Sequence, residues 1–181
     1  HPQHRRQRQM CIRDSYDLGI LFEEVEEANK NEPITFFEIL TAAYFYNASK
    51  YPENINLIET GLFHRFDATN ILKNNLASIV TSIGLDHLDW LPENEQTTKK
   101  IIFEKTSTLV NSNIIIAKQS SSQIVNEIKS SILKNSSKKY FFNEDYNYSS
   151  NENGFIFYED KNGGIKLPTP NVKGQFQLEN I

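Results

Sequence analysis

The residues Ala77-Ser78-Ile79-Val80-Thr81-Ser82-Ile83-Gly84-Leu85-Asp86-His87 join a short apolar run to a polar Asp-His pair. Short apolar runs of this kind, rich in β-branched side chains, are typical of buried strands in a parallel sheet. Two similar runs are Ile55-Asn56-Leu57-Ile58 and Ile114-Ile115-Ile116-Ala117, and helical patterns cover 95–106 and 124–133. The alternation predicts an α/β fold with a mostly parallel sheet flanked by helices.

Two helices are predicted before these runs, and a small antiparallel addition after them. Apolar residues between Leu18 and Ala28 follow helical spacing opposite a row of glutamates, which predicts an amphipathic surface helix. The helix expected after Pro33 is apolar around most of its circumference, which predicts that it is buried or packs on a ligand. Near the C-terminus, aromatic strands at 154–158 and 164–167 flank an Asp160-Lys161-Asn162-Gly163 turn.

Residues 1–14 differ in composition from the rest of the chain. They contain the only cysteine, the only methionine and four of the five arginines. The run Met10-Cys11-Ile12-Arg13-Asp14-Ser15 resembles translated sequencing-adaptor sequence, so we interpret 1–14 as non-native and expect it to add nothing to the fold. The alternative is a basic arm that binds nucleic acid, although no aromatic residue or glycine lies between its arginines.

Charge and composition exclude several function classes for residues 15–181. Without the first fourteen residues the formal net charge changes from −4 to −7, and Arg65 is the only arginine left. An acidic body with one arginine is a poor partner for a phosphate backbone, so no nucleic-acid partner is expected. No apolar run approaches the roughly 18 residues of a membrane span, and no secretory signal is evident. These features predict a cytoplasmic protein without a membrane partner.

Three polar clusters are predicted at the edge where open α/β sheets bind ligands. They are Glu59-Thr60-Gly61-Leu62-Phe63-His64-Arg65-Phe66-Asp67-Ala68-Thr69-Asn70, Asp86-His87 and Glu104-Lys105. Taken singly, each has an ordinary interpretation: Glu59 as a cap of the next turn, His87 as a satisfied loop histidine and Lys105 as a solvated helix lysine. For the residues taken alone, these ordinary interpretations are favoured.

Together these motifs resemble folylpolyglutamate/dihydrofolate synthases, which are relatives of the Mur ligases. In that family a strand ends in Glu-Val-Gly-Leu-Gly-Gly-Arg-Leu-Asp-Ala-Thr-Asn, and Thr-Ser-Ile-Xaa-Leu-Asp-His and Glu-Lys follow. The segments 59–70, 81–87 and 104–105 match these motifs in order, and Ile34-Thr35-Phe36-Phe37-Glu38 matches the family's Thr-Xaa-Phe-Glu. The resemblance runs from about Tyr16 to Ile181.

The resemblance implies that 15–181 is an incomplete Mur ligase-like central domain. The phosphate-loop unit before it and the C-terminal domain after it would lie outside this chain, which contains no glycine-rich loop ending in Gly-Lys-Ser or Gly-Lys-Thr. The run 175–181 is expected to begin a helix that continues. The intact protein is expected to be a monomer, and this chain is expected to be inactive alone.

The implied activity is ATP-dependent ligation of L-glutamate to dihydropteroate or a folate through an acyl phosphate, with Mg²⁺ as the metal. By matched position, Glu59 and His87 would be Mg²⁺ ligands, Lys105 would be carbamylated to support the metal, and Asn70 would bind the nucleotide. A carbamate supplies the oxygen ligand that Mg²⁺ prefers, whereas an ammonium does not. The metal would neutralise the repulsion between two anionic substrates.

A pterin pocket is the second implied feature. Phe37 and Phe66 are candidates for its apolar walls, and Thr35 and Asp67 for its polar contacts. Core packing is the alternative for both phenylalanines, and it is favoured for Phe36.

The chain departs from the family pattern at Phe63-His64, where the family has Gly-Gly. Side chains there would reshape any close backbone approach. Two other functions therefore stay open. One is another Mur-type amide ligase, acting on a peptidoglycan precursor. The other is a degenerate, non-catalytic domain that binds a pterin-like ligand.

Overall fold

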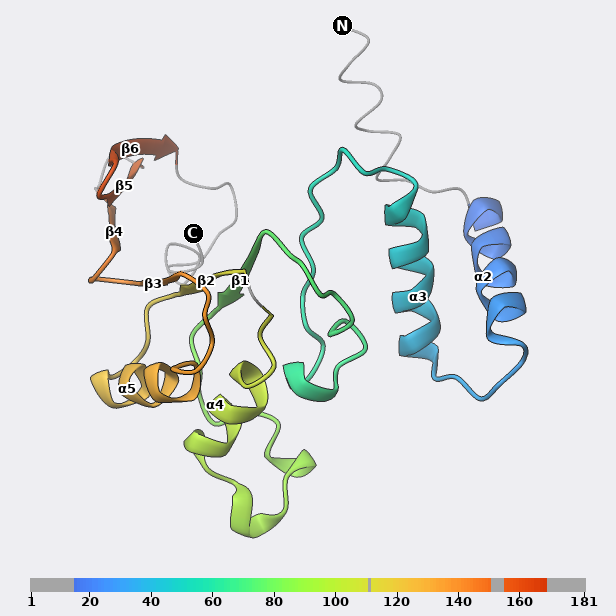
Figure 1. Cartoon of the computed structure of the whole chain (residues 1–181), viewed down its shortest axis with the longest axis horizontal. Coiled ribbons are helices and arrows are strands. Elements are labelled where there is room, and N and C mark those ends of the chain that lie inside the picture. The colour runs from blue at the N-terminus through green and yellow to red at the C-terminus, as the bar shows by residue number, and fades with distance from the viewer. Residues whose placement is uncertain (1–14, 111, 151–154, 169–181) are drawn as a thin grey trace, which may run out of the picture. The chain divides into compact units, whose positions relative to one another are not determined.

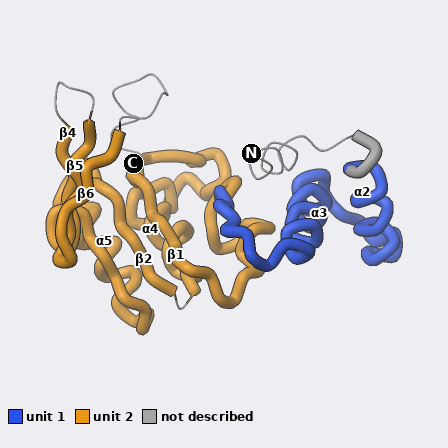
Figure 2. The backbone as a smooth tube through the Cα atoms, turned by 90° about the horizontal axis from the view of Figure 1, so that it is seen from above, with its two compact units in different colours: residues 1–59 blue, residues 60–181 orange. Residues whose placement is uncertain are grey.

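The computed structural model describes residues 15–110, 112–150 and 155–168. The chain divides into two compact units, 1–59 and 60–181 (Figure 2). The adaptor-like segment 1–14, the predicted helix start at 175–181 and Gly154 lie outside the described residues. Among the described residues, no helix combines the length and apolar character that a membrane span requires.

Unit 1 contains the helices α2 (Ser15–Asn29) and α3 (Phe36–Ser49) (Figure 1). Leu21 and Val25 of α2 are buried in one cluster with Ala43 of α3, so the predicted amphipathic surface helix is confirmed. Burial, the first of the two alternatives predicted for α3, is wrong, because Ala43 is its only buried residue in the described structure and Phe36 is 75% exposed; packing on a ligand stays a prediction. A helix packed on one neighbour buries a single stripe, whatever the composition of its other faces.

The predicted strand at 55–58 is also wrong. These residues form no strand, and the side chains of Ile55 and Leu57 are 84% and 90% exposed. A strand requires a partner for its backbone N–H and C=O groups, and no ladder in the described part of the chain includes this segment.

The parallel sheet of unit 2 is formed by β1 (Ala77–Val80), β2 (Asn113–Ile116) and β3 (Lys139–Phe141), in that order. The helices α4 (Thr98–Thr106) and α5 (Ser122–Ser131) connect successive strands and lie on the same side of the sheet (Figure 1). Successive parallel strands need a crossover of this kind. The predicted α/β class is therefore confirmed.

The core of unit 2 lies between this sheet and its two helices. Ile114 and Ile116 of β2 are buried against Ile101 and Ile102 of α4 and Ile128 of α5. Because side chains alternate along a strand, Ile115 faces the other side of the sheet. The core also receives Phe63 and Ile83, which belong to the motif-bearing loops.

The predicted antiparallel addition is confirmed in the strands β4 (Tyr146–Ser150), β5 (Phe155–Asp160) and β6 (Gly163–Pro168). In the turn between β5 and β6, the Asn162 N–H donates to the Asp160 Oδ1 at 2.7 Å. Gly163 has a φ of 135°, a conformation that L side chains rarely adopt. The turn chemistry in the sequence therefore fixes this hairpin.

The Ile128→Ala variant should lower the free energy of unfolding by about 2–5 kcal/mol, because a fully buried side chain leaves a cavity when it is truncated. The matched control is Leu133→Ala, which removes a side chain that is 77% exposed and should cost less than about 0.5 kcal/mol. Urea denaturation of both variants measures the difference. Equal losses would contradict the position of the core.

Candidate functional site

The carboxylate of Asp86 lies between His87 and Lys105. It follows β1 by six residues, and its Oδ1 accepts the backbone N–H of His87 at 2.8 Å. Its Oδ2 is 3.1 Å from the His87 Nε2 and 3.9 Å from the Lys105 Nζ of α4. The structure thus brings together two of the three residues predicted to support a metal, through an acid that the sequence reasoning did not select. The adjacent Asp86-His87 and Glu104-Lys105 pairs were the available signal.

Asp86 is the most solvent-exposed residue of this cluster. More than half of the Asp86 side chain is exposed, whereas about a third of each of His87 and Lys105 is exposed. A carboxylate oxygen and a neutral imidazole can both serve a divalent ion. Lys105 fits such an ion only as an oxygen-bearing adduct, because an ammonium has no lone pair to offer. The described residues contain no group of three or more acidic, histidine or cysteine side chains placed to hold a metal.

Glu59 is exposed and is the last residue of unit 1. His87 and Lys105 belong to unit 2. The convergence of the three residues on one metal therefore stays a prediction.

The predicted ligand residues Asp67 and Asn70 hold the loop 60–70 together. Asp67 accepts hydrogen bonds from the backbone N–H groups of Gly61, Leu62 and Thr69 at 2.9–3.1 Å, and also from the Thr69 hydroxyl. Partial burial raises the pKa of Asp67, but these hydrogen bonds outweigh it and hold the pKa below its usual value. The Asn70 Nδ2 donates to the Thr108 Oγ1 at 3.1 Å and to the Arg65 carbonyl at 3.4 Å.

An ion pair between a half-buried arginine and a buried carboxylate ties this loop to α4. Arg65 precedes Phe66 in the 3₁₀ turn η1 (His64–Phe66), and its Nε and Nη2 donate to the two oxygens of Glu104 at 2.6 and 2.8 Å. Glu104 is only 2% exposed, and Lys100 adds a contact at 3.3 Å. The bonds from Arg65 lower the pKa of Glu104, burial opposes them and Lys100 assists, so the pKa lies below its usual value. The carboxylate next to Lys105 therefore stays ionised.

The two side chains that replace the family glycines are both accommodated. Phe63 is buried in the core, and its ring meets the His87 ring edge to face. The His64 Nδ1 lies 2.9 Å from the Thr108 Oγ1. Burial lowers the pKa of His64, although Asp67 partly opposes this shift, so its neutral form is favoured.

The predicted pterin-binding residues are divided between the units. In unit 1 the hydroxyl of Thr35 accepts the Glu38 N–H at 3.2 Å and donates to the Glu38 Oε2 at 2.6 Å, which caps α3, and Phe37 is about half exposed. In unit 2 Phe66 is 79% exposed and lies under the Arg65 guanidinium, 4.0 Å from the ring centre. Core packing is thus wrong for Phe37 and Phe66, and also for Phe36, for which the sequence favours it and which is 75% exposed; the binding roles of Phe37 and Phe66 stay predictions.

Gln119 is a positioning residue that the sequence reasoning missed. Its Oε1 accepts the Ile83 N–H at 2.9 Å, and its Nε2 donates to the carbonyls of Thr81 and Ala117 at 3.1 and 2.8 Å. The amide thereby clamps the start of the segment 81–87 to the residues that follow β2. A glutamine two residues after the predicted strand 114–117 was the only sequence signal.

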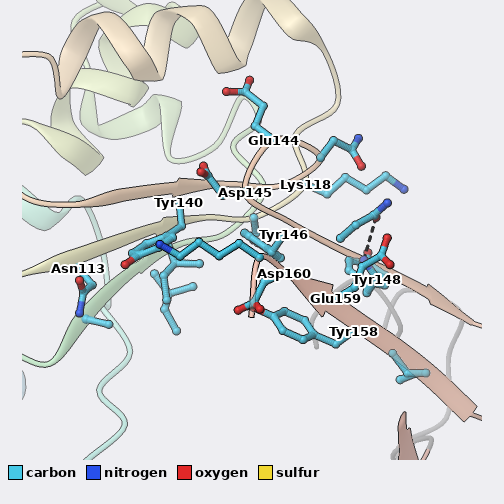
Figure 3. Close-up of a pocket in the computed structure, with 18 of the residues that line it drawn as sticks. Asn113, Lys118, Tyr140, Glu144, Asp145, Tyr146, Tyr148, Tyr158, Glu159 and Asp160 are labelled. Carbon is cyan, nitrogen blue, oxygen red and sulfur yellow. Dashed lines mark hydrogen bonds between the residues drawn. The ribbon is translucent and has the colours of Figure 1, made fainter. Parts of the chain in front are cut away.

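A separate pocket of about 1090 Å³ lies between the two sheets of unit 2. Its lining includes Tyr140 of β3, Tyr146 of β4 and Tyr158 of β5, which Figure 3 shows around the space on the sheet face opposite the helices. None of the predicted site residues lines it, although Thr81 and Ser82 of the motif segment 81–87 do.

Comparison with known proteins supports the resemblance drawn from the motifs. No family model matches the chain. The dihydrofolate synthase/folylpolyglutamate synthase of Haemophilus influenzae is 38% identical over 79 residues, which are 44% of this chain and 17% of that protein. The structure of Escherichia coli FolC with DHPP and ADP has a TM-score of 0.70 at 26% identity, covering 87% of this chain and 36% of that chain.

A bifunctional folylpolyglutamate synthase/dihydrofolate synthase of Yersinia pestis, complexed with AMPPNP and a Mn ion, has a TM-score of 0.69 at 23% identity. The alignment covers 88% of this chain and 37% of that one. The likenesses confirm both the α/β class and the resemblance to this family. The chain spans well under half the length of the proteins that it matches.

The Arg65→Ala variant should lose about 2–3 kcal/mol of stability near neutral pH, because it leaves the Glu104 carboxylate buried with Lys100 as its remaining partner. Folding lowers the pKa of Glu104, so the stabilisation is present above the ordinary glutamate pKa of about 4.3 and disappears as the pH falls through the folded-state pKa. The deficit should therefore shrink in acid.

Urea denaturation of Arg65→Ala between pH 3 and 8, with Arg65→Lys as the control that keeps the charge, measures this dependence. The lysine variant should lose less stability than the alanine variant, because its ammonium still neutralises Glu104. It should remain less stable than the wild type, because lysine cannot form the bidentate pair that arginine forms. A deficit that is constant with pH would show that the ion pair does not stabilise the fold.

Proposed function

We propose that this chain is the interior part of a ligase that uses MgATP to join L-glutamate to dihydropteroate or a folate. The observation that carries the proposal is the Asp86, His87 and Lys105 cluster, formed by motifs shared with folylpolyglutamate/dihydrofolate synthases. The FolC and Yersinia complexes contain ADP or AMPPNP, and one contains Mn, which supports a nucleotide and a divalent metal as cofactors. The chain covers only part of such an enzyme.

The chemistry needs positive charge close to two anionic substrates. Transfer of the γ-phosphoryl group of ATP to the substrate carboxylate brings two anions together, gives an acyl phosphate and releases ADP. The amine of glutamate then attacks the acyl carbon, phosphate leaves, the nitrogen loses a proton and the amide bond is formed. A divalent ion bound near His87 would supply the positive charge that offsets the anionic repulsion.

Each predicted residue has a role in this proposal. His87 would bind the ion through a ring nitrogen, and Glu59 would add a carboxylate. Lys105, as a carbamate, would supply oxygen. Asp86 would hold the backbone of His87 in place through the hydrogen bond to its N–H. Asn70 would approach the nucleotide from the loop that it helps to order.

The substrate surface is proposed from the exposed aromatic residues. Phe66 offers an open ring face next to Arg65, and Phe37 offers a half-exposed ring near the start of α3. Planar heteroaromatic rings bind such surfaces by stacking. Thr35 and Asp67 would also contact the substrate. They already form hydrogen bonds within the protein, so only their remaining lone pairs would be available for these contacts.

Lys105 should take up carbon dioxide as a carbamate. With ¹³C-labelled bicarbonate and Mg²⁺, the ¹³C spectrum should show one carbamate signal in the wild-type chain and none in Lys105→Arg. Lys99→Arg is the matched control, because Lys99 lies on the same helix but is exposed, and this variant should keep the signal. A signal that survives Lys105→Arg would contradict the proposed role.

The 181-residue chain should bind MgATP with a Kd above about 1 mM and show no ligase activity. Phosphate affinity in such enzymes comes largely from backbone N–H groups of a glycine-rich loop, and this sequence has none. Calorimetric titration measures the binding, and micromolar affinity would place the nucleotide site within these residues.

A longer protein that contains this segment should convert dihydropteroate, L-glutamate and ATP to product with release of phosphate. Lys105→Arg in that protein should reduce the rate at least about 100-fold, the scale of losing one preorganised electrostatic group. Activity only on a UDP-linked substrate would favour the other Mur-type ligase. No activity on either substrate would favour a non-catalytic domain.

A further inference from the structure

The contact between Phe63 and His87 joins the two motif-bearing loops of unit 2. The two ring centroids are 5.8 Å apart, and the ring planes make an angle of 84°. This edge-to-face arrangement is a favoured geometry for aromatic pairs. It involves a phenylalanine at a position where the family motif has glycine, so the contact belongs to this sequence in particular.

Phe63 is held firmly on its own side of the contact. It is 7% exposed and packs in the core with Val80 and Ile83, which lie at the end of β1 and in the segment after it. On either side along the chain, the Leu62 N–H donates to Asp67 at 3.0 Å and His64 contacts Thr108 at 2.9 Å. A side chain fixed by both packing and backbone contacts is a rigid support for the ring that it touches.

His87 needs such a support because its other constraints leave its ring incompletely fixed. Its backbone is left-handed, with φ 54° and ψ 33°, and Asp86 holds its N–H. The Asp86 Oδ2 lies 3.1 Å from Nε2, but that carboxylate is more than half exposed. The Phe63 ring, by contrast, is buried, so it gives the imidazole a fixed surface to pack against.

We infer that Phe63 is a positioning residue for His87, which holds the imidazole in the single orientation that can meet a divalent ion. The part of this inference that concerns the ion rests on the proposed function. Residues that orient a metal ligand commonly change metal affinity by about 10- to 100-fold when they are replaced. Phe63 would act in this way through ring packing instead of a hydrogen bond.

The test compares Phe63→Leu with Phe141→Leu in the full 181-residue chain. Phe63 and Phe141 are each 7% exposed and belong to the same core cluster, so both variants remove a buried ring of equal exposure. Only the first removes the ring next to His87. Phe63→Met is the second variant, should Phe63→Leu fail to fold. The His87→Gln variant assigns the signals.

Two NMR measurements separate orientation from metal binding. Without metal, the χ1 couplings of His87 should report one rotamer in the wild type and in Phe141→Leu, and an average of rotamers in Phe63→Leu. With Mn²⁺, the His87 ring signals should broaden in the wild type, and Phe63→Leu should need about tenfold more Mn²⁺ for equal broadening. His64 should broaden less in every protein.

A single His87 rotamer and unchanged Mn²⁺ broadening in Phe63→Leu would overturn the inference. Equal effects in Phe141→Leu would also overturn it, because they would trace the change to general loosening of the core. If the χ1 couplings of His87 become averaged in Phe63→Leu but Mn²⁺ broadens the His87 ring signals in no protein, Phe63 still orients the ring and the proposed metal site is wrong.

Discussion

The buried carboxylate of Glu104 is the constraint on which the rest of unit 2 depends. A charge this deeply buried is tolerated only with a well-placed partner, and Arg65 supplies two parallel hydrogen bonds. Arg65 is also the only arginine in residues 15–181. The pair therefore brings the loop 60–70 onto α4, and its geometry requires the planar fork that lysine lacks.

Once the loop is held there, the other contacts reinforce one another. Asp67 closes the loop on itself, Asn70 and His64 both reach Thr108, and Phe63 enters the core. The second loop is fixed independently, because Gln119 clamps the residues between β1 and Asp86. The Phe63 to His87 contact then joins two segments whose backbones are already ordered, so its entropy cost is confined to the His87 side chain.

The sequence predicted elements well where local pattern and tertiary packing agree. The β-branched runs at β1 and β2 and the Asp-Lys-Asn-Gly turn all specify their own conformation. The sequence-based predictions failed where a packing or pairing partner determines the structure. Ile55 and Leu57 have strand character but belong to no ladder in the described residues, and α3 has apolar faces that a single neighbouring helix does not cover. The motifs selected His87 and Lys105 as candidate site residues, but the bridging position of Asp86 between them depends on how α4 approaches the end of β1, which no local pattern encodes.

The charge balance of the cluster depends on the chemical state of Lys105. As an ammonium, Lys105 neutralises Asp86 across 3.9 Å, and the pair is self-sufficient. As a carbamate it would face Asp86 with a second negative charge, and two carboxylate-like groups so close together repel each other unless a cation is nearby. Glu104 is already neutralised by Arg65 and Lys100, so it adds little to this repulsion. In the proposed function, carbamylation and metal binding would therefore be coupled by electrostatics: the cation would relieve the repulsion that the carbamate creates, and the carbamate would add an oxygen ligand beside the one that Asp86 can offer.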